Sequence, residues 1–265
     1  TLDSIGNPRK FSRIARHLAR KKPVVVFAPG RTRRNDHAGV RGGLGHAPDE
    51  AVDALFRQAG VMVVHNRGDM IDIAKIATRQ PLPRGPRVRI VTNSLTLSHQ
   101  MMQKMDSVGL FHDPEPELLG ADARAAAFAQ TARAALADSR YDSVVCAAVN
   151  AFDRGTEEVI LALEQVAVEG VKPLVGVFLD FHPALGSNGE PDSRGSLPRF
   201  DSSVDAIQAL ASLTAYAQWC AQDPGAVPVL DVDSQAARRV VNRVLAQQPQ
   251  GRELTTAETA ELLSS

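Results

Sequence analysis

The stretch that decides the fold is KPVVVFAPGR, residues 22–31, which is followed after a Gly- and His-rich loop by AVDALFRQAG, residues 51–60, and VMVV, residues 61–64. Unbroken runs of Val and Phe are typical of buried parallel strands, and the apolar residues of 51–60 recur at helical spacing. A strand, a helix and a second strand in this order predict a parallel α/β unit. A loop between a strand and a helix can offer backbone N–H groups to an anion, so the stretch indicates acyl, phosphate or nucleotide chemistry, or what remains of it.

The same alternation continues along the chain. Beyond 24–27 and 61–64, strands are predicted at 88–92, 143–149, 173–178 and 227–229. Helices are predicted at 4–21, 51–59, 70–78, 98–108, 121–137, 156–169, 203–222 and 234–247. The run QPLPRGP, residues 80–86, breaks regular structure and predicts a domain boundary. The fold class is therefore predicted to be α/β with parallel sheets.

Composition narrows the classes of partner. The 265 residues, of which 44% are hydrophobic, suffice for about two domains. Thirty basic and thirty acidic residues give no net field that would favour nucleic acid or an anionic membrane, and no apolar run is long enough to span a bilayer. Cys146 and Cys220 lack metal-ligand spacing, so we expect free thiols, no metal site and a reducing cytoplasm.

Four segments, spread over most of the chain and in conserved order, carry a family resemblance. They are SIGNPRKFSRIARHLARKKPVVVFAPGR (4–31), AVDALFRQAGVMVV (51–64), QPLPRGPRVRIVTNS (80–94) and DAIQALASLTAYAQW (205–219). The chain resembles the NDP-forming (ADP-forming) acyl-CoA synthetases, relatives of succinyl-CoA synthetase. It is most similar to the synthetase-like region of bacterial GNAT-type protein lysine acetyltransferases. The resemblance implies two flavodoxin-like (Rossmann-like) three-layer parallel-sheet units.

The resemblance also implies a domain organisation. Residues 1–80 would be the C-terminal part of a succinyl-CoA-ligase-like flavodoxin domain, 81–86 a linker, and 87–232 a second flavodoxin-like CoA-ligase domain. Residues 233–265 would be a helical tail leading toward an ATP-grasp domain outside these residues. The implied ligand is CoA or acetyl-CoA, with ATP or ADP and Mg bound only through the outside domain. The implied partners are the ATP-grasp and CoA-binding domains of the same chain, an acetyltransferase domain, and further copies in a homo-oligomer.

One departure from the family concerns its phosphohistidine. In active members the loop before the 51–60 helix reads approximately Ser-His-Thr-Gly-Ala-Leu-Ala-Gly, and its His accepts a phosphoryl group. Counting back from Ala51 without a gap places Arg41 at that position. A guanidinium stays protonated and has no free lone pair, so it cannot accept phosphate. His37 or His46 could substitute only if the loop slid, which would move the acceptor away from its donor. No catalytic residue is expected.

A second departure follows the strand 88–92. Active relatives have a Gly-Gly-Pro-Gly-like turn there, whereas this chain has SLTLS, residues 94–98. The leucines replace residues that let backbone approach phosphate, although a Ser or Thr could still cap a helix. The family also has an Asn-Pro-Val-Asp-Leu signature further along the chain, and it is unrecognisable here in PEPELL, residues 114–119. The candidate cofactor-binding residues are Gly30, Arg31, Gly42, Gly43, Asn93, Ser94 and Thr96.

Other residues allow two interpretations. Arg31, Arg33, Arg34 and Arg41 could bind a CoA or nucleotide phosphate, or form a solvated loop. Asp180 and His182 follow a strand, where a loop hydrogen bond is favoured over a metal or acid–base role. The basic helix 4–21 carries an apolar stripe expected to face a core, which favours a surface helix over RNA or lipid contact. Tyr216 and Trp219 are predicted to pack against the second sheet.

Three functions stay open. The first is a degenerate synthetase-like region that acts as a regulatory or scaffold part of a larger CoA-dependent protein acetyltransferase. The second is an active ADP-forming acetate/acyl-CoA ligase that works through a phosphohistidine, and the third is a ligand-free interaction module. The missing nucleophile at Arg41 favours the first. These residues by themselves are expected to catalyse no reaction.

Overall fold

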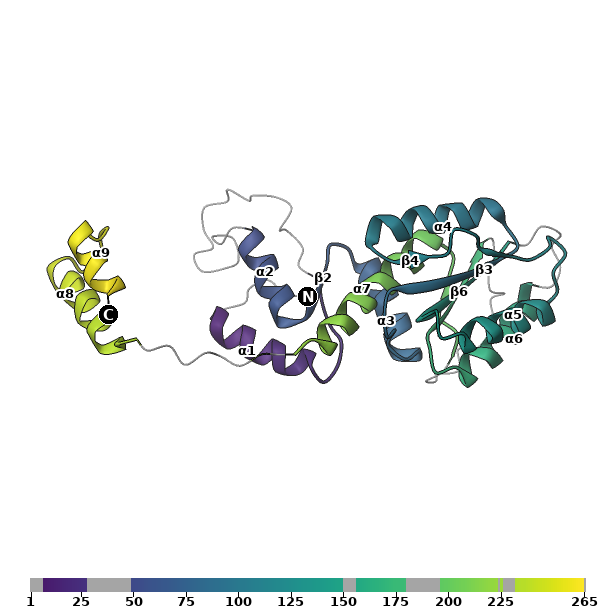
Figure 1. Cartoon of the computed structure of the whole chain (residues 1–265), viewed down its shortest axis with the longest axis horizontal. Helices are drawn as coiled ribbons and strands as arrows, with labels where there is room; N and C mark the ends of the chain where they lie inside the picture. Colours follow the sequence, from purple (N-terminus) through teal and green to yellow (C-terminus); the bar gives the residue numbers. More distant parts are fainter. Residues whose placement is uncertain are drawn as a thin grey trace. The chain divides into compact units, whose positions relative to one another are not determined.

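Two parallel sheets organise the larger part of the computed structural model, which describes residues 7–27, 49–149, 156–179, 196–223, 225 and 232–264. By compactness the chain divides into residues 1–222 and residues 223–265 (Figure 1). The first sheet pairs β1 (Val24–Phe27) with β2 (Val61–Val64), with Val24 opposite Val61. The predicted α/β class with parallel sheets is confirmed.

Three helices accompany the first sheet. They are α1 (Pro8–Ala19), α2 (Asp49–Ala59) and α3 (Arg67–Arg79). The Asn7 side chain accepts the Lys10 N–H at 3.1 Å and Pro8 opens the helix, which explains why α1 begins there rather than at residue 4. A small core of Ala15, Val52, Phe56, Ala59 and Val61 holds α1 and α2 on the strands.

The second sheet is six-stranded and parallel. Its strands are β3 (Arg87–Thr92), β4 (Phe111–His112), β5 (Glu117–Leu118), β6 (Ser143–Val149), β7 (Leu174–Leu179) and β8 (Arg199–Phe200). The order is β4-β3-β6-β7-β8, and β5 also pairs with β3. Its helices are α4 (Leu95–Val108), α5 (Ala125–Ala137), α6 (Thr156–Glu169) and α7 (Ser203–Ala221). The short strands β4, β5 and β8 were not predicted, because two residues carry no periodicity.

Side-chain alternation along the strands divides the core into two layers. Val145 and Ala147 of β6 pack with α4 and α7, whereas Val144, Cys146 and Ala148 pack with α5 and α6. Figure 1 shows α4 on one side of the sheet and α5 and α6 on the other. The first of these layers also contains Ile73 and Ile76 of α3, so it includes residues from both sides of 81–86. The predicted division at 81–86 stays a prediction.

The C-terminal end of α7 is hydrogen-bonded to the C-terminal end of α1. The Tyr216 hydroxyl donates to the Ala19 carbonyl at 2.6 Å, and the Arg20 guanidinium donates to the Cys220 carbonyl at 2.8 Å. The same guanidinium lies 4.4 Å from the centre of the Trp219 ring. The prediction that Tyr216 and Trp219 pack against the second sheet is therefore wrong, because the last turns of α7 extend beyond that sheet to α1.

The α1 surface also differs from expectation. Ala15 and Ala19 are buried, but Ile14 is 52% exposed and Leu18 is 38% exposed. The apolar stripe is therefore only partly directed at a core. Small alanines permit close packing on α2, and the larger side chains one position away are left in solvent.

Residues 223–265 form the second compact unit. They contain α8 (Ser234–Gln247) and α9 (Thr256–Leu263), which pack on one another as a helical hairpin. Thr255 and Glu258 form a capping box at the start of α9, and Arg252 pairs with Glu258 at 2.7 Å. Hydrogen bonds from Arg252 and Thr255 hold the pKa of Glu258 well below its usual value. The predicted strand 227–229 lies outside the described residues.

Candidate functional site

The carboxyl edge of the six-stranded sheet has the topology of an α/β ligand site. β4 lies on one side of β3 and β6 lies on the other, so the chain changes direction between β3 and β6. Ligands of open α/β sheets bind outside the carboxyl ends of the strands at such a switch point. Two predicted site residues, Asn93 and Ser94, follow β3 directly at this edge.

Asn93 joins the two strand ends at the switch point. Its Nδ2 donates to the Val149 carbonyl at 3.0 Å, and its Oδ1 accepts the Val149 N–H at 2.9 Å. The side-chain amide thus continues the β3–β6 pairing beyond the last backbone pair, Thr92 opposite Ala147. Both ends of the amide are used, so Asn93 shapes the edge, and one N–H and one oxygen lone pair are left for other partners.

Ser94 caps the N-terminus of α4. Its Oγ accepts the Leu97 N–H at 3.3 Å, and its own N–H donates to the Thr92 hydroxyl oxygen at 3.1 Å. One of the helix-terminal N–H groups is thereby satisfied from within the chain. Leu95, in the first turn, is 51% exposed, and Thr96 is exposed beside it. Leu95 thus adds an exposed apolar side chain to the first turn of this helix.

The structure brings together three of the predicted site residues. Asn93, Ser94 and Thr96 lie within four residues of one another around the start of α4. The other predicted residues lie outside the described residues: Gly30, Arg31, Arg33, Arg34, His37, Arg41, Gly42, Gly43, His46, Asp180 and His182. The roles predicted for them stay predictions.

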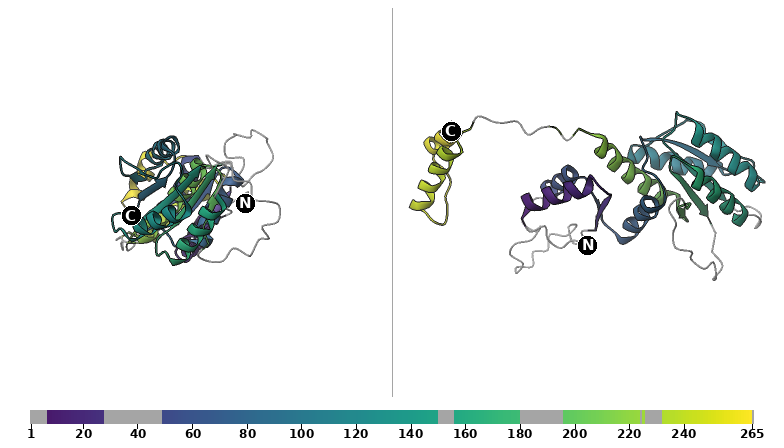
Figure 2. Two further views of the ribbon diagram at one scale, coloured as in Figure 1. Left: turned by 90° about the vertical axis from the view of Figure 1, so that its right-hand side faces the viewer. Right: turned by 90° about the horizontal axis from the view of Figure 1, so that it is seen from below.

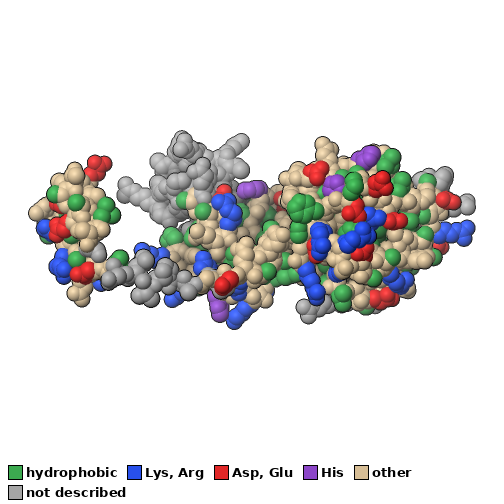
Figure 3. All heavy atoms as spheres, in the orientation of Figure 1, with side chains coloured by type: hydrophobic (Ala, Val, Ile, Leu, Met, Phe, Trp, Pro, Cys, Tyr) green, Lys and Arg blue, Asp and Glu red, His purple; other side chains and the backbone are tan. Residues whose placement is uncertain are grey.

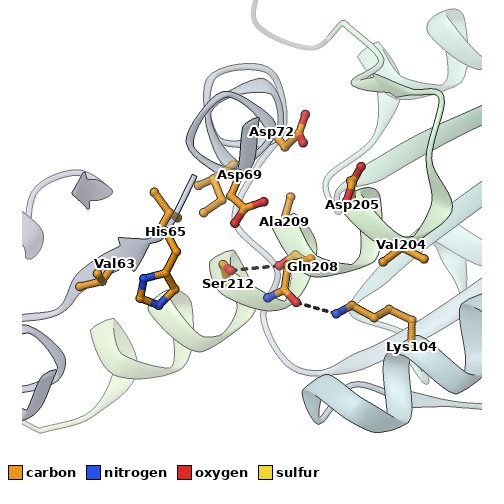
Figure 4. A pocket seen from close by; sticks show the side chains of 12 residues that line it. Val63, His65, Asp69, Asp72, Lys104, Val204, Asp205, Gln208, Ala209 and Ser212 are labelled. Carbon is orange, nitrogen blue, oxygen red and sulfur yellow. Dashed lines mark hydrogen bonds between the residues drawn. The ribbon is translucent and has the colours of Figure 1, made fainter. Parts of the chain in front are cut away.

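A hollow that the sequence did not suggest lies at the carboxyl end of β2 (Figure 4). It measures about 380 Å³ and is lined by α3, α4 and α7 together with His65. Lys104 Nζ donates to Gln208 Oε1 at 2.7 Å across it, and the Ser212 hydroxyl donates to the Gln208 carbonyl at 3.0 Å. Among the described residues no group of three His, Cys, Asp or Glu side chains is arranged to hold a metal ion.

The N-termini of the helices that border this hollow can be recognised in the sequence. Asn66 caps α3 by accepting the Asp69 N–H at 2.8 Å, and Ser202 caps α7 by accepting the Asp205 N–H at 3.3 Å. A cap residue followed three positions later by an acid marks a helix N-terminus in sequence. The same signal predicts carboxylates at both helix starts, but it does not predict that α3 and α7 lie together.

Another hollow, of about 300 Å³, lies beside Arg89 of β3. The Arg89 guanidinium pairs with Asp113 at 2.7 Å and with Glu117 at 2.5 Å, and it lies 5.5 Å from the centre of the Tyr141 ring. The Tyr141 hydroxyl donates to Asp113. Burial and this hydrogen bond raise the pKa of Tyr141. The network ties β4 and β5 to β3, so we interpret it as structural.

Comparison with known proteins supports the family resemblance over part of the chain. Residues 1–77 match a protein-family profile described as the succinyl-CoA ligase like flavodoxin domain. The alpha subunit of acetate–CoA ligase [ADP-forming] II from Pyrococcus furiosus is 33% identical over 98 residues, which are 35% of this chain and 20% of the relative. The 4-hydroxybutyrate–CoA ligase [ADP-forming] from Nitrosopumilus maritimus is 21% identical over 92% of this chain and 38% of the relative.

A solved structure shares the fold. The dinucleotide forming acetyl-coenzyme A synthetase 1 of Ca. Korarchaeum cryptofilum, in its apo form, superposes with a TM-score of 0.68 at 18% identity, over 83% of this chain and 52% of that one. This chain therefore spans about half the length of the solved relative and less of the curated ones. The predicted flavodoxin-like α/β fold is confirmed, and residues 1–77 have the predicted succinyl-CoA ligase-like character. The link to a protein acetyltransferase stays a prediction.

Proposed function

We propose that this chain is a synthetase-like region without phosphoryl relay, which serves as the regulatory or scaffold part of a larger CoA-dependent protein acetyltransferase. The observation that carries the proposal is the start of α4. Ser94 uses its own hydroxyl to satisfy a helix-terminal N–H. Leu95 adds an exposed apolar side chain at the turn where active relatives have glycines that let phosphate approach the backbone. Arg41, at the sequence position of the family's phosphoryl acceptor, is consistent with the same loss.

The carboxyl edge nevertheless retains features of a ligand site, which supports a binding role. The β3–β6 switch point is intact, and Asn93 fixes the two strand ends rigidly. The positive end of the α4 dipole still favours an anionic group bound along this edge, without the direct phosphate contact to the turn that a phosphoryl relay requires. The ligand class that suits such an edge is a CoA thioester or CoA, with nucleotide and Mg reaching the protein through another domain.

Calorimetric titration with acetyl-CoA and CoA tests the binding role. Thr96→Glu adds a negative charge on an exposed position of the first turn of α4, where acids stabilise a helix, so the fold should persist while the phosphates are repelled. Gln103→Glu adds the same charge on an exposed position of α4 away from this edge and is the matched control. Binding that Thr96→Glu abolishes and Gln103→Glu retains supports the proposal. No heat at millimolar ligand would leave a ligand-free interaction module.

One observation favours a second candidate, an active ADP-forming acyl-CoA ligase. A relative named 4-hydroxybutyrate–CoA ligase matches this chain over 92% of its length. Ligase activity through a phosphohistidine would require His37 or His46 to serve as the acceptor.

Labelling separates the two candidates. The complete polypeptide that contains this chain is incubated with labelled ATP or acetyl phosphate and assayed for acid-labile, base-stable label. The proposal predicts no such label. Label that is lost in His37→Ala or His46→Ala, and retained in the control His17→Ala on the exposed face of α1, would establish the ligase instead.

A further inference from the structure

α1 presents an apolar pair surrounded by positive charge. Ile14 and Leu18, one turn apart, are 52% and 38% exposed. Seven Lys and Arg residues and no acid occupy residues 8–22: Arg9, Lys10, Arg13, Arg16, Arg20, Lys21 and Lys22. Figure 3 shows Lys and Arg side chains gathered over the region that Figure 1 labels α1. At 3.6 residues per turn, Lys10 and Arg13 lie beside Ile14 and Leu18, whereas Arg20 is bonded to the end of α7. An apolar pair with a basic margin is suited to a partner with an acidic margin.

α6 presents the complementary surface. Leu161 and Val168, two turns apart on one face, are 56% and 68% exposed, and Val171 just beyond the helix is 75% exposed. The helix contains four glutamates and no Lys or Arg: Glu157, Glu158, Glu164 and Glu169. At 3.6 residues per turn, the first three of these flank the Leu161–Val168 line on both sides. Glu169 pairs with Arg133 and Glu164 lies 3.9 Å from Arg199, so the acidic margin of this apolar ridge rests mainly on Glu157 and Glu158.

We propose that α1 of one chain docks on α6 of a second copy of the same chain. Ile14 and Leu18 then pack against Leu161 and Val168, and the basic margin of α1 faces the acidic margin of α6. Contact of α1 with α1, or of α6 with α6, brings like charges together, so the charge pattern selects the mixed pairing. Such self-association does not depend on whether a CoA ligand binds.

A second copy is needed because the two surfaces do not meet within one chain. α1 packs on α2 and the first sheet, whereas α6 packs on α5 and β7. Figure 1 and the right-hand view of Figure 2 show α1 and α6 at well-separated positions of residues 1–222. A two-fold dimer makes the α1–α6 contact twice, which brings the buried area closer to that of a stable interface.

Sedimentation equilibrium of the complete polypeptide tests the pairing. We expect reversible self-association at about 50 mM salt that weakens at about 500 mM, because the charges of the two margins are exposed and screened. The α6 variant Glu157→Lys with Glu158→Lys, and the α1 variant Lys10→Glu with Arg13→Glu, should each weaken association about tenfold. These four side chains are exposed, so circular dichroism should show unchanged helix content in both variants.

The decisive measurement is the self-association of a chain that carries all four charge reversals. It exchanges the charges of the two surfaces, so complementarity returns and association should recover toward that of the native chain. A matched control, Glu115→Lys with Asp122→Lys, reverses two exposed acids outside both surfaces and should leave association unchanged. A monomer at low salt, or association lost in the α1 variant but not in the α6 variant, would overturn the proposal. Failure of the combined chain to recover would also do so.

Discussion

Trp219 lies directly against the Cα of Gly60. A Cβ built on Gly60 would sit 2.4 Å from Trp219 Cζ3, and Gly60 has a φ of +71°. We expect Gly60→Ala to destabilise the protein by about 2–4 kcal/mol, because the left-handed backbone and the clash with the ring both cost free energy. Urea unfolding measures the loss.

Gly109 separates those two costs. It has a φ of +74° at the C-terminus of α4, but no atom lies within 4 Å of a built Cβ. Gly109→Ala should therefore lose only about 1–2 kcal/mol, the backbone part. Equal losses for the two substitutions would show that Trp219 does not press on Gly60 in solution.

Asn93→Ala should loosen the β3–β6 edge. It leaves the N–H and C=O of Val149 without the side-chain amide and should cost about 1–3 kcal/mol. Asn93→Asp can accept the Val149 N–H but cannot donate to its carbonyl, so it should recover only part of the loss. Hydrogen exchange of the Val149 amide is the direct readout. An equally protected amide in Asn93→Ala would contradict the role assigned to this side chain.

Asp142 should make stability depend on acid pH. Burial acts to raise the pKa of Asp142, but hydrogen bonds from the Arg87 N–H and guanidinium, both at 3.1 Å, outweigh it and leave this pKa below its ordinary value. The carboxylate therefore contributes stability above pH of about 4, and this contribution is lost as pH falls through the lower pKa of the folded state. Urea unfolding at neutral and acid pH should show a smaller acid loss for Asp142→Asn than for the native chain. Parallel pH profiles would disprove the linkage.

Cys146 should be unreactive in the folded protein. It is fully buried in β6, and burial raises the pKa of its thiol to about 12, so the nucleophilic thiolate is scarce at neutral pH. In a Cys220→Ser background, a thiol reagent should label Cys146 only after denaturant is added. Labelling of the native variant at the rate of a free thiol would show that the strand opens.

Local signals in the sequence predicted the regular elements well, and the reason is physical. The runs at β6 and β7 are apolar on both faces, which identifies buried parallel strands, and Asn7 with Pro8 marks a helix start. The carboxyl-edge position of Asn93 and Ser94 followed from the strand before them. These inferences needed only neighbours in the chain.

The missed features depend on long-range contacts. Nothing in residues 203–221 reveals that the last turns of α7 reach Ala19 and Arg20, because that contact depends on the relative position of the two sheets. The α1 stripe was misjudged because Ala15 and Ala19, rather than the larger Ile14 and Leu18, are the buried residues. The hollow at His65 likewise arises only when α3 and α7 come together.

The bonds that link Arg20 and Ala19 to the end of α7 join residues about 200 positions apart in the chain. On the ribosome, the first helix is made long before its anchor emerges, so the N-terminal half cannot complete its packing until nearly the whole of residues 1–222 has been synthesised. The final packing of the N-terminal elements is thus delayed until late in translation. A polypeptide that ends before α7 would keep these elements incompletely folded, which makes them a substrate for chaperones and proteases.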